Sequence, residues 1–147
     1  MTIIEVIKNK KQFLSLLLLA DEQENMIDRY LKRGTMYVLD DNGVKAECVV
    51  ADEGDGILEI KNIATVPEYQ GKGYAKALID FIVKEYADKY SVLQVGTGDS
   101  HLTVPFYEKC GFVRSHIIPN FFTDNYDHPI YEDGVQLVDM IYLRRRL

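Results

Sequence analysis

Apolar side chains recur along this chain with two periods, and each period predicts one type of secondary structure. Residues 75–90 carry apolar side chains at three- and four-residue spacing with charged side chains between them, which is typical of an amphipathic helix. Residues 57–66 are rich in β-branched side chains and predict a strand, which Pro67 ends. The best-patterned helix of the chain therefore follows closely on a strand.

The remaining segments show the same two signatures. Residues 35–40 and 44–51 flank Asn42-Gly43, and two strand-like runs around an Asn-Gly turn predict a β-hairpin. The other predicted elements are a strand at 2–7, a helix from Asn9 through Leu18, a second helix through Met26 and Leu31 that stops at Lys32-Arg33-Gly34, a strand at 91–95, a short helix up to Lys109-Cys110-Gly111, and strands at 112–118 and 135–143. This order predicts an α/β (α+β) fold, with a mixed, mostly antiparallel sheet of about six to seven strands and about four helices on its faces.

Two local arrangements follow from the same patterns. Asp21 and Glu24 have the spacing of a capping box, in which Asp21 accepts from the backbone and Glu24 reaches back. In the strand at 57–66, a regular pleat would place Glu59, Lys61 and Ile63 on one face.

Composition narrows the class of protein. A chain of 147 residues that is 47% hydrophobic and 27% charged is expected to form one globular domain, residues 1–147. The net charge of −6 argues against a nucleic-acid partner. The apolar run FLSLLLLA is far shorter than the ~20 residues that span a bilayer, so no membrane partner is expected. Cys48 and Cys110 are too few for a disulfide framework or a metal cluster, which suits a reducing cytoplasm.

Gly71 and Gly73 stand where the amphipathic helix should begin. Glycine in a helix interior costs roughly 0.5–1 kcal/mol relative to alanine, so a turn that keeps two of them has a use for bare backbone. The first turn of a helix has unpaired N–H groups and a positive dipole end, which attract phosphate. A simple strand-to-helix connection is the alternative explanation.

The sequence of this turn excludes two common phosphate-binding motifs. A P-loop requires GxxxxGK[ST], which is absent. A dinucleotide-binding fingerprint requires Gly or Ala where Lys76 stands, and the preceding hairpin is the wrong setting for it.

The stretch Gln70-Gly71-Lys72-Gly73-Tyr74-Ala75 has the pattern Q-x-x-G-x-A between a strand and a long helix, with FYEKCGF downstream. In this setting it resembles the acetyl-CoA pyrophosphate loop of the GNAT N-acetyltransferase superfamily. The order of elements is similar over about residues 2–143, and the motifs match at 59–76 and 91–112. The resemblance implies the GNAT fold and a CoA pyrophosphate bound by the turn, at residues Gln70, Gly71, Lys72, Gly73, Tyr74, Ala75 and Lys76.

The resemblance also assigns the strand before the turn. In this superfamily that strand splays from its neighbour, and its free backbone groups pair with the pantetheine arm of CoA. The matching positions are Ile63, Ala64 and Thr65, and the Ile63 N–H matches the donor that polarises the acetyl carbonyl. All three side chains remain free to pack in the core.

Tyr107 occupies the position at which the superfamily carries its proton donor to the leaving thiolate. A phenol with a reference pKa near 10 is protonated at neutral pH and able to donate. The alternative is a packed aromatic residue on a short helix.

Glu59 lies four positions before Ile63, where histone-type members carry a general base. The alternatives are an ion pair with Lys61 or another cation, and proton loss to water without a dedicated base. Val95 stands where other members place a base on the next strand, and it is unable to serve as one.

Two polar residues follow that strand. Ser100 occupies the position whose side chain often bonds the pantetheine region, although a serine there is also suited to capping the helix. His101 is a possible proton acceptor or a solvated histidine.

Residues 118–134 match the loop that forms one wall of the acceptor site in the superfamily. The loop combines aromatic side chains with carboxylates, which suits an amine cation, and the alternative is a surface loop pinned by its own aromatics. These residues are Phe121, Phe122, Tyr126 and Tyr131 with Asp124, Asp127, Glu132 and Asp133.

The resemblance thus predicts a cytoplasmic N-acetyltransferase that uses acetyl-CoA as co-substrate, without a metal. A primary amine of a small molecule or peptide attacks the thioester directly, because no nucleophile constellation supports an acyl-enzyme. The alternative is a catalytically weak CoA-binding sensor or interaction module on the same fold. A homodimer is expected only because members of the superfamily commonly form dimers.

Overall fold

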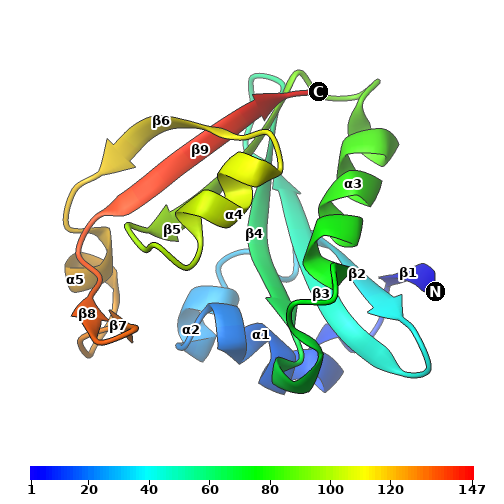
Figure 1. The fold of residues 1–147 in the computed structure, drawn as a ribbon, viewed down its shortest axis with the longest axis horizontal. Coiled ribbons are helices and arrows are strands. Elements are labelled where there is room, and N and C mark those ends of the chain that lie inside the picture. The colour runs from blue at the N-terminus through cyan, green and yellow to red at the C-terminus, as the bar shows by residue number, and fades with distance from the viewer.

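The computed structural model describes residues 1–147, and its centre is a seven-stranded sheet with the order β1-β2-β3-β4-β5-β9-β6 (Figure 1). Its strands are β1 (Thr2–Val6), β2 (Thr35–Asp40), β3 (Val44–Asp52), β4 (Ile57–Thr65), β5 (Val92–Gly98), β6 (Val113–Ile118) and β9 (Met140–Arg146). All neighbours are antiparallel except β4 and β5. The mixed, mostly antiparallel sheet expected from the sequence is confirmed.

Helices cover both faces of this sheet. They are α1 (Leu14–Ala20), α2 (Glu24–Ile27), α3 (Tyr74–Tyr86), α4 (Val104–Lys109) and α5 (Phe121–Asn125), with 3₁₀ turns at Lys10–Phe13 and Pro67–Tyr69. The core on one face includes Leu78 and Ile82 of α3 and Val104 of α4. The core on the other face includes Leu17 of α1 and Ile27 of α2. None of these helices has the length and apolar character needed to cross a membrane.

The parallel pair β4–β5 is the feature that positions the site. Pairing runs from Ile57–Val92 to Ile60–Val95 and then stops, although both strands continue. Beyond this point β4 pairs only with β3, and β5 pairs only with β9. The two strands therefore separate, and the β5-facing edge of residues 61–65 has no partner strand.

A β-bulge in β4 corrects the expected pleat. Val49 pairs with Asn62 and Val50 pairs with Ile60, so Lys61 is the extra residue. The extra residue reverses the alternation, and Ile63 packs with Ile60 in the core under α3. Glu59, Lys61 and Ile63 therefore do not share one face.

Two segments near the N-terminus also differ from expectation. The side chain of Asp21 does not cap α2, whose N-cap is Gln23 without a side-chain hydrogen bond. Helix α2 is only four residues long, and the chain continues as turns. The Lys10 ammonium donates to the carbonyls of Leu31 and Gly34 at 2.9 and 2.7 Å, which satisfies carbonyls at the end of this segment.

The C-terminal part holds the largest difference in element boundaries. The last strand is β9 and not 135–143, because Val135–Gln136 (β8) pairs with Tyr131–Glu132 (β7) in a separate two-stranded sheet. Helix α5 was not expected, and it brings the number of α-helices to five. A small cluster of Phe122, Ile130 and Leu137 holds α5, β7 and β8 together. The expected loop at 118–134 is thus a folded unit.

Candidate active site

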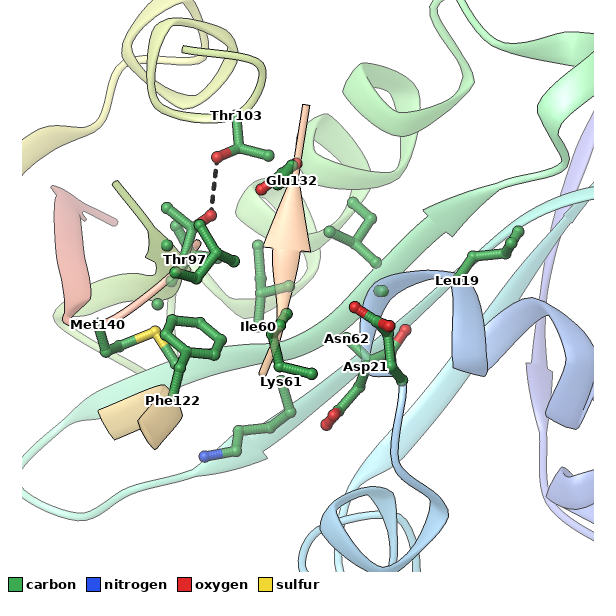
Figure 2. Close-up of a pocket in the computed structure, with 18 of the residues that line it drawn as sticks. Leu19, Asp21, Ile60, Lys61, Asn62, Thr97, Thr103, Phe122, Glu132 and Met140 are labelled. Carbon is green, nitrogen blue, oxygen red and sulfur yellow. Dashed lines mark hydrogen bonds between the residues drawn. The ribbon is translucent and has the colours of Figure 1, made fainter. Parts of the chain in front are cut away.

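A cavity of about 340 Å³ lies where β4 and β5 separate. Residues 60–63 of β4 and residues 95–98 of β5 form its floor. Residues 19–22 at the end of α1, Tyr107 of α4 and the unit of α5, β7 and β8 form its walls. Figure 2 shows Thr97 and Thr103 on one side of this cavity and Asp21 and Asn62 on the other. The site is therefore assembled from segments far apart in the sequence.

Residues 63–65 lie on the unpaired edge of β4. Ile63 lines the cavity, and the partners of Ile63, Ala64 and Thr65 are all on β3, at Cys48, Glu47 and Ala46. The opposite edge of this segment is free to pair with an extended ligand, as β-strand addition requires. The separation of β4 from β5 that the resemblance implied is present, and the pairing of these three residues with pantetheine stays a prediction.

The glycine turn follows this edge and presents bare backbone. Gly71 and Gly73 have φ of 78° and 85°, a left-handed conformation that favours glycine, and nothing lies within 4 Å of where a Cβ would stand. The first helical hydrogen bond of α3 runs from the Ala77 N–H to the Gly73 carbonyl. The N–H groups of residues 71–76 therefore donate to no backbone acceptor, and no side chain caps the helix.

Side chains around this turn hold it in place or point outward. The Gln70 amide donates to the Thr65 carbonyl at 3.5 Å and so ties the turn to the end of β4. The Tyr74 hydroxyl donates to Asp41 at 2.7 Å, and Lys76 pairs with Asp80 at 2.8 Å on the exposed side of α3. Backbone N–H groups and two nearby cationic side chains, Lys72 and Lys76, suit a pyrophosphate.

Tyr107 is fixed in the cavity wall by its neighbours. Its ring packs edge-on against Phe106 and Phe112, with ring centroids 5.3 and 5.8 Å apart, and 7% of the residue is exposed. Burial raises the pKa of the phenol above its ordinary value, so the hydroxyl keeps its proton at neutral pH. Tyr107 is therefore a packed aromatic residue that also lines the cavity.

Glu59 belongs to a polar row that crosses three strands. Its carboxylate accepts from the Gln94 amide and from the Lys61 ammonium at 2.9 Å, and Gln94 accepts from Arg144 Nε at 2.9 Å. Glu59 is 5% exposed and lines a second hollow of about 160 Å³ beside the main cavity. The ion pair with Lys61, which the sequence left open as the alternative to a general base, is present, and both oxygens of Glu59 have a partner.

Ser100 and His101 have different surroundings. Ser100 is buried, and its hydroxyl accepts from the Leu102 N–H at 3.1 Å, so it stabilises the turn before α4. His101 is exposed, with Nε2 3.0 Å from a carboxylate oxygen of Asp133. Neither residue lines the main cavity.

Two side-chain pairings in the cavity wall were not expected from the sequence. Thr97 and Thr103 share a hydrogen bond of 2.7 Å between their hydroxyls. Asp21 accepts from the hydroxyls of Tyr30 and Tyr126 at 3.0 and 2.6 Å. Tyr126 is 105 residues from Asp21, and a pairing at that distance leaves no local signal in the sequence.

Only some of the aromatic and acidic residues predicted at 118–134 to form a wall of the acceptor site line the two hollows. Phe122, Tyr126, Tyr131 and Glu132 line the main cavity, and Phe121 lines the second hollow. Asp124, Asp127 and Asp133 line neither.

The two cysteines are free and buried. Burial raises the pKa of both the Cys48 and the Cys110 thiols, which disfavours a thiolate nucleophile. This agrees with the direct transfer expected from the sequence.

Comparisons with known proteins agree with this geometry. A family model described as an acetyltransferase (GNAT) domain matches residues 32–114. The N-acetyltransferase YvbK of Bacillus subtilis (strain 168) is 36% identical over 131 residues, which cover 87% of this chain and 84% of YvbK.

Two crystal structures extend the similarity to the fold. A GNAT family acetyltransferase from Elizabethkingia anophelis with acetyl-CoA bound has a TM-score of 0.94 and 35% identity, covering 99% of this chain and 97% of that chain. A Bacillus subtilis acetyltransferase in complex with CoA has a TM-score of 0.89 and 33% identity, also covering 99% and 97%. The splayed strands and the glycine turn define an acyltransferase architecture, and this chain belongs to the GNAT acetyltransferase family.

Proposed function

We propose that residues 1–147 form one N-acetyltransferase domain that moves an acetyl group from acetyl-CoA directly to a primary amine of a small molecule or peptide. The observation that carries the proposal is that two nearby stretches have unpaired backbone groups, the β5-facing edge of residues 61–65 of β4 and the N–H groups of residues 71–76 in the glycine turn. The similar structures with acetyl-CoA and CoA bound support the same co-substrate.

In this proposal the pantetheine arm pairs with the free edge of β4 at Ile63, Ala64 and Thr65. The pyrophosphate accepts from the N–H groups at residues 71–76, with Gln70 tying the turn to β4. Ser100 supports the pantetheine side by holding the turn before α4. The thioester then lies in the cavity between β4 and β5.

The chemistry needs an oxyanion partner, a proton acceptor and a proton donor. The Ile63 N–H polarises the acetyl carbonyl as the amine attacks. The amine loses its proton to Glu59 or to water, and the tetrahedral intermediate collapses with loss of the CoA thiolate. Tyr107, kept protonated by burial, gives its proton to that thiolate.

A second reading has a specific observation in its favour. Both oxygens of Glu59 are engaged by Gln94 and Lys61, and Val95 occupies the alternative position for a base. A CoA-binding sensor or interaction module on this fold would bind CoA without turnover.

One experiment separates the two readings. The protein is incubated with acetyl-CoA and a panel of primary amines while free thiol is measured, and CoA binding is measured by calorimetry. Thiol release that depends on an amine supports the transferase, whereas CoA binding with no release supports the sensor. Absence of both would overturn the proposal.

Two broader features are also proposed. A cytoplasmic location is supported by the two free cysteines, which suit a reducing compartment. A homodimer is the expected assembly, and light scattering of the purified protein tests it.

A further inference from the structure

Asp21 is a buried carboxylate in the cavity wall that the transfer chemistry described above does not use. It is 9% exposed and lines both the main cavity and the second hollow. Each of its oxygens accepts one tyrosine hydroxyl, Oδ2 from Tyr30 at 3.0 Å and Oδ1 from Tyr126 at 2.6 Å. A carboxylate oxygen has room for a further donor, so the group remains able to bind a ligand from the cavity.

The partners of Asp21 favour its ionised form without neutralising it. Burial raises its pKa, and the hydrogen bonds from Tyr126 and Tyr30 oppose that rise. The basic group that acts on its charge is Arg29, which acts through space while its guanidinium donates to Asn125 at 3.2 Å. Asp21 is therefore held by neutral donors and not by an ion pair.

A short relay places Asp21 beside the proposed transfer centre. The Asn62 amide donates at 3.0 Å to the Tyr30 hydroxyl, which in turn donates to Asp21. Asn62 directly precedes Ile63, whose N–H faces the thioester in the proposed function. Figure 2 shows Asp21 and Asn62 close together at the same side of the cavity.

The other charges of the cavity also favour a cation. The Lys61 ammonium is bound by Glu53 and Glu59 at 2.8 and 2.9 Å, so it presents its alkyl chain to the cavity. Glu22 and Glu132 add two further carboxylates to the lining. The described lining residues thus supply three carboxylates and one already paired ammonium.

Aromatic rings stand next to this carboxylate. Phe122 and Tyr126 are stacked with ring centroids 5.7 Å apart and an angle of 21° between the rings, and both line the cavity. A cation near an aromatic face gains further stabilisation, so these rings complement Asp21 as a site for an ammonium group.

We propose that Asp21 binds the ammonium group of the acceptor, and that the protein therefore selects small alkyl amines that are cations at neutral pH over neutral molecules of the same size. The ammonium loses its proton to Glu59 or water before it attacks. This inference rests on the proposed function, because it assigns the acceptor of the same cavity.

The test compares a cation with its neutral analogue. Calorimetry measures the binding of benzylamine and of benzyl alcohol to the CoA-bound protein, and the KM and kcat for benzylamine are measured in parallel. Asp21→Asn should weaken the binding of benzylamine by about 10- to 100-fold, the range expected for losing a hydrogen bond to a charged group, and raise its KM similarly. The affinity for benzyl alcohol should change by about twofold or less, and kcat by about threefold or less.

Two further variants separate charge from packing. Glu22→Gln removes an exposed carboxylate of the same wall and should change the benzylamine affinity by about threefold or less. Tyr126→Phe removes one hydroxyl donor, keeps the charge of Asp21, and should preserve the preference for benzylamine over benzyl alcohol.

The possible outcomes are distinct. Equal binding of the two molecules by the unchanged protein would overturn the inference, and so would an equal loss of both in Asp21→Asn. A preference for benzylamine that Asp21→Asn abolishes supports it. If that preference is present and no amine is acetylated, the proposed function fails while the amine site stands.

Discussion

The two sides of the proposed site are built from different parts of the chain. On the side of β4 and the glycine turn, the available groups are mainly backbone groups of two local stretches, residues 61–65 and residues 71–76. On the opposite side, the available groups are side chains such as Asp21 and Tyr126, which come from distant segments and are bonded to one another. A site made of backbone groups is disrupted mainly by replacing the glycines that leave it open. A site made of side chains loses a binding group whenever one of those side chains is replaced.

The largest expected effect tests the backbone side at Gly73. Gly73→Glu should abolish CoA binding, because the new carboxylate would occupy the space of the pyrophosphate and repel it. Calorimetry with CoA measures this.

Gly54→Glu is the matched control for this substitution. Gly54 has the same φ of 85° as Gly73 and also has nothing within 4 Å of the Cβ position. Both variants therefore carry a similar conformational cost of roughly 1–2 kcal/mol, and only Gly73→Glu should lose CoA. Equal CoA affinity in the two folded variants would place the pyrophosphate elsewhere.

The next largest effect concerns Tyr107, which lines the cavity from α4. Tyr107→Phe should lower kcat by ~10²–10⁴, the usual range for a positioned general acid, and should leave CoA affinity nearly unchanged. The loss should appear in kcat and kcat/KM together, because the interaction forms in the transition state. Single-turnover acetylation with saturating acetyl-CoA measures the chemical step directly, even where product release limits kcat.

The raised pKa of Tyr107 also predicts the shape of the pH profile. Burial holds the proton on the phenol to higher pH than in an ordinary tyrosine, so donation should persist through the whole neutral range and fail only above pH ~10. A loss of activity at lower alkaline pH that disappears in Tyr107→Phe would contradict this assignment.

A smaller effect is expected at Glu59, on the polar row behind the cavity. Glu59→Gln should lower kcat/KM by about 10- to 100-fold at neutral pH if this carboxylate takes the proton of the amine, and the loss should shrink as pH rises. The reason is that the free-amine fraction grows with pH and no longer needs a base.

Glu53→Gln serves as the control for Glu59. Glu53 pairs with the same Lys61 ammonium at 2.8 Å and lines neither hollow of the site. Equal kinetics in the two variants would assign the proton to water.

The smallest effect should come from Lys76, an exposed side chain beside the backbone site. Lys76→Gln should weaken CoA by about threefold or less, and the difference should fade at high salt, because exposed charges are well screened. A loss as large as that of Gly73→Glu would show that side-chain charge dominates this half of the site as well.

The difference between the two sides also explains what the sequence could predict. The glycine turn is a continuous stretch whose conformational needs appear in its residue types, and the run from Gln70 to Lys76 was placed correctly beside the end of β4. The succession of strands along the chain as far as Ile118 followed from hydrophobic periodicity in the same way, whereas the position of β9 between β5 and β6 was not predicted.

The rest depends on long-range packing. The bulge at Lys61 arises from the pairing of β4 with β3, and no residue type within 57–65 predicts it. Asp21 has the local spacing of a helix cap, but its carboxylate accepts hydrogen bonds from the hydroxyls of Tyr30 and Tyr126 and does not cap α2. The separation of Val135–Gln136 from β9 follows from its pairing with β7 in the small second sheet.

The unit of α5, β7 and β8 has its own three-residue cluster, apart from the two cores that hold the main sheet. It meets the α1–α2 region through polar contacts, from Tyr126 to Asp21, from the Asp127 N–H to Gln23, and from Arg29 to Asn125. This part of the cavity wall is therefore held by its own cluster and by polar contacts, and not by the two cores of the main sheet. We therefore expect substitutions within residues 119–139 to change which acceptors the cavity admits, while the separated strands β4 and β5 and the glycine turn stay intact.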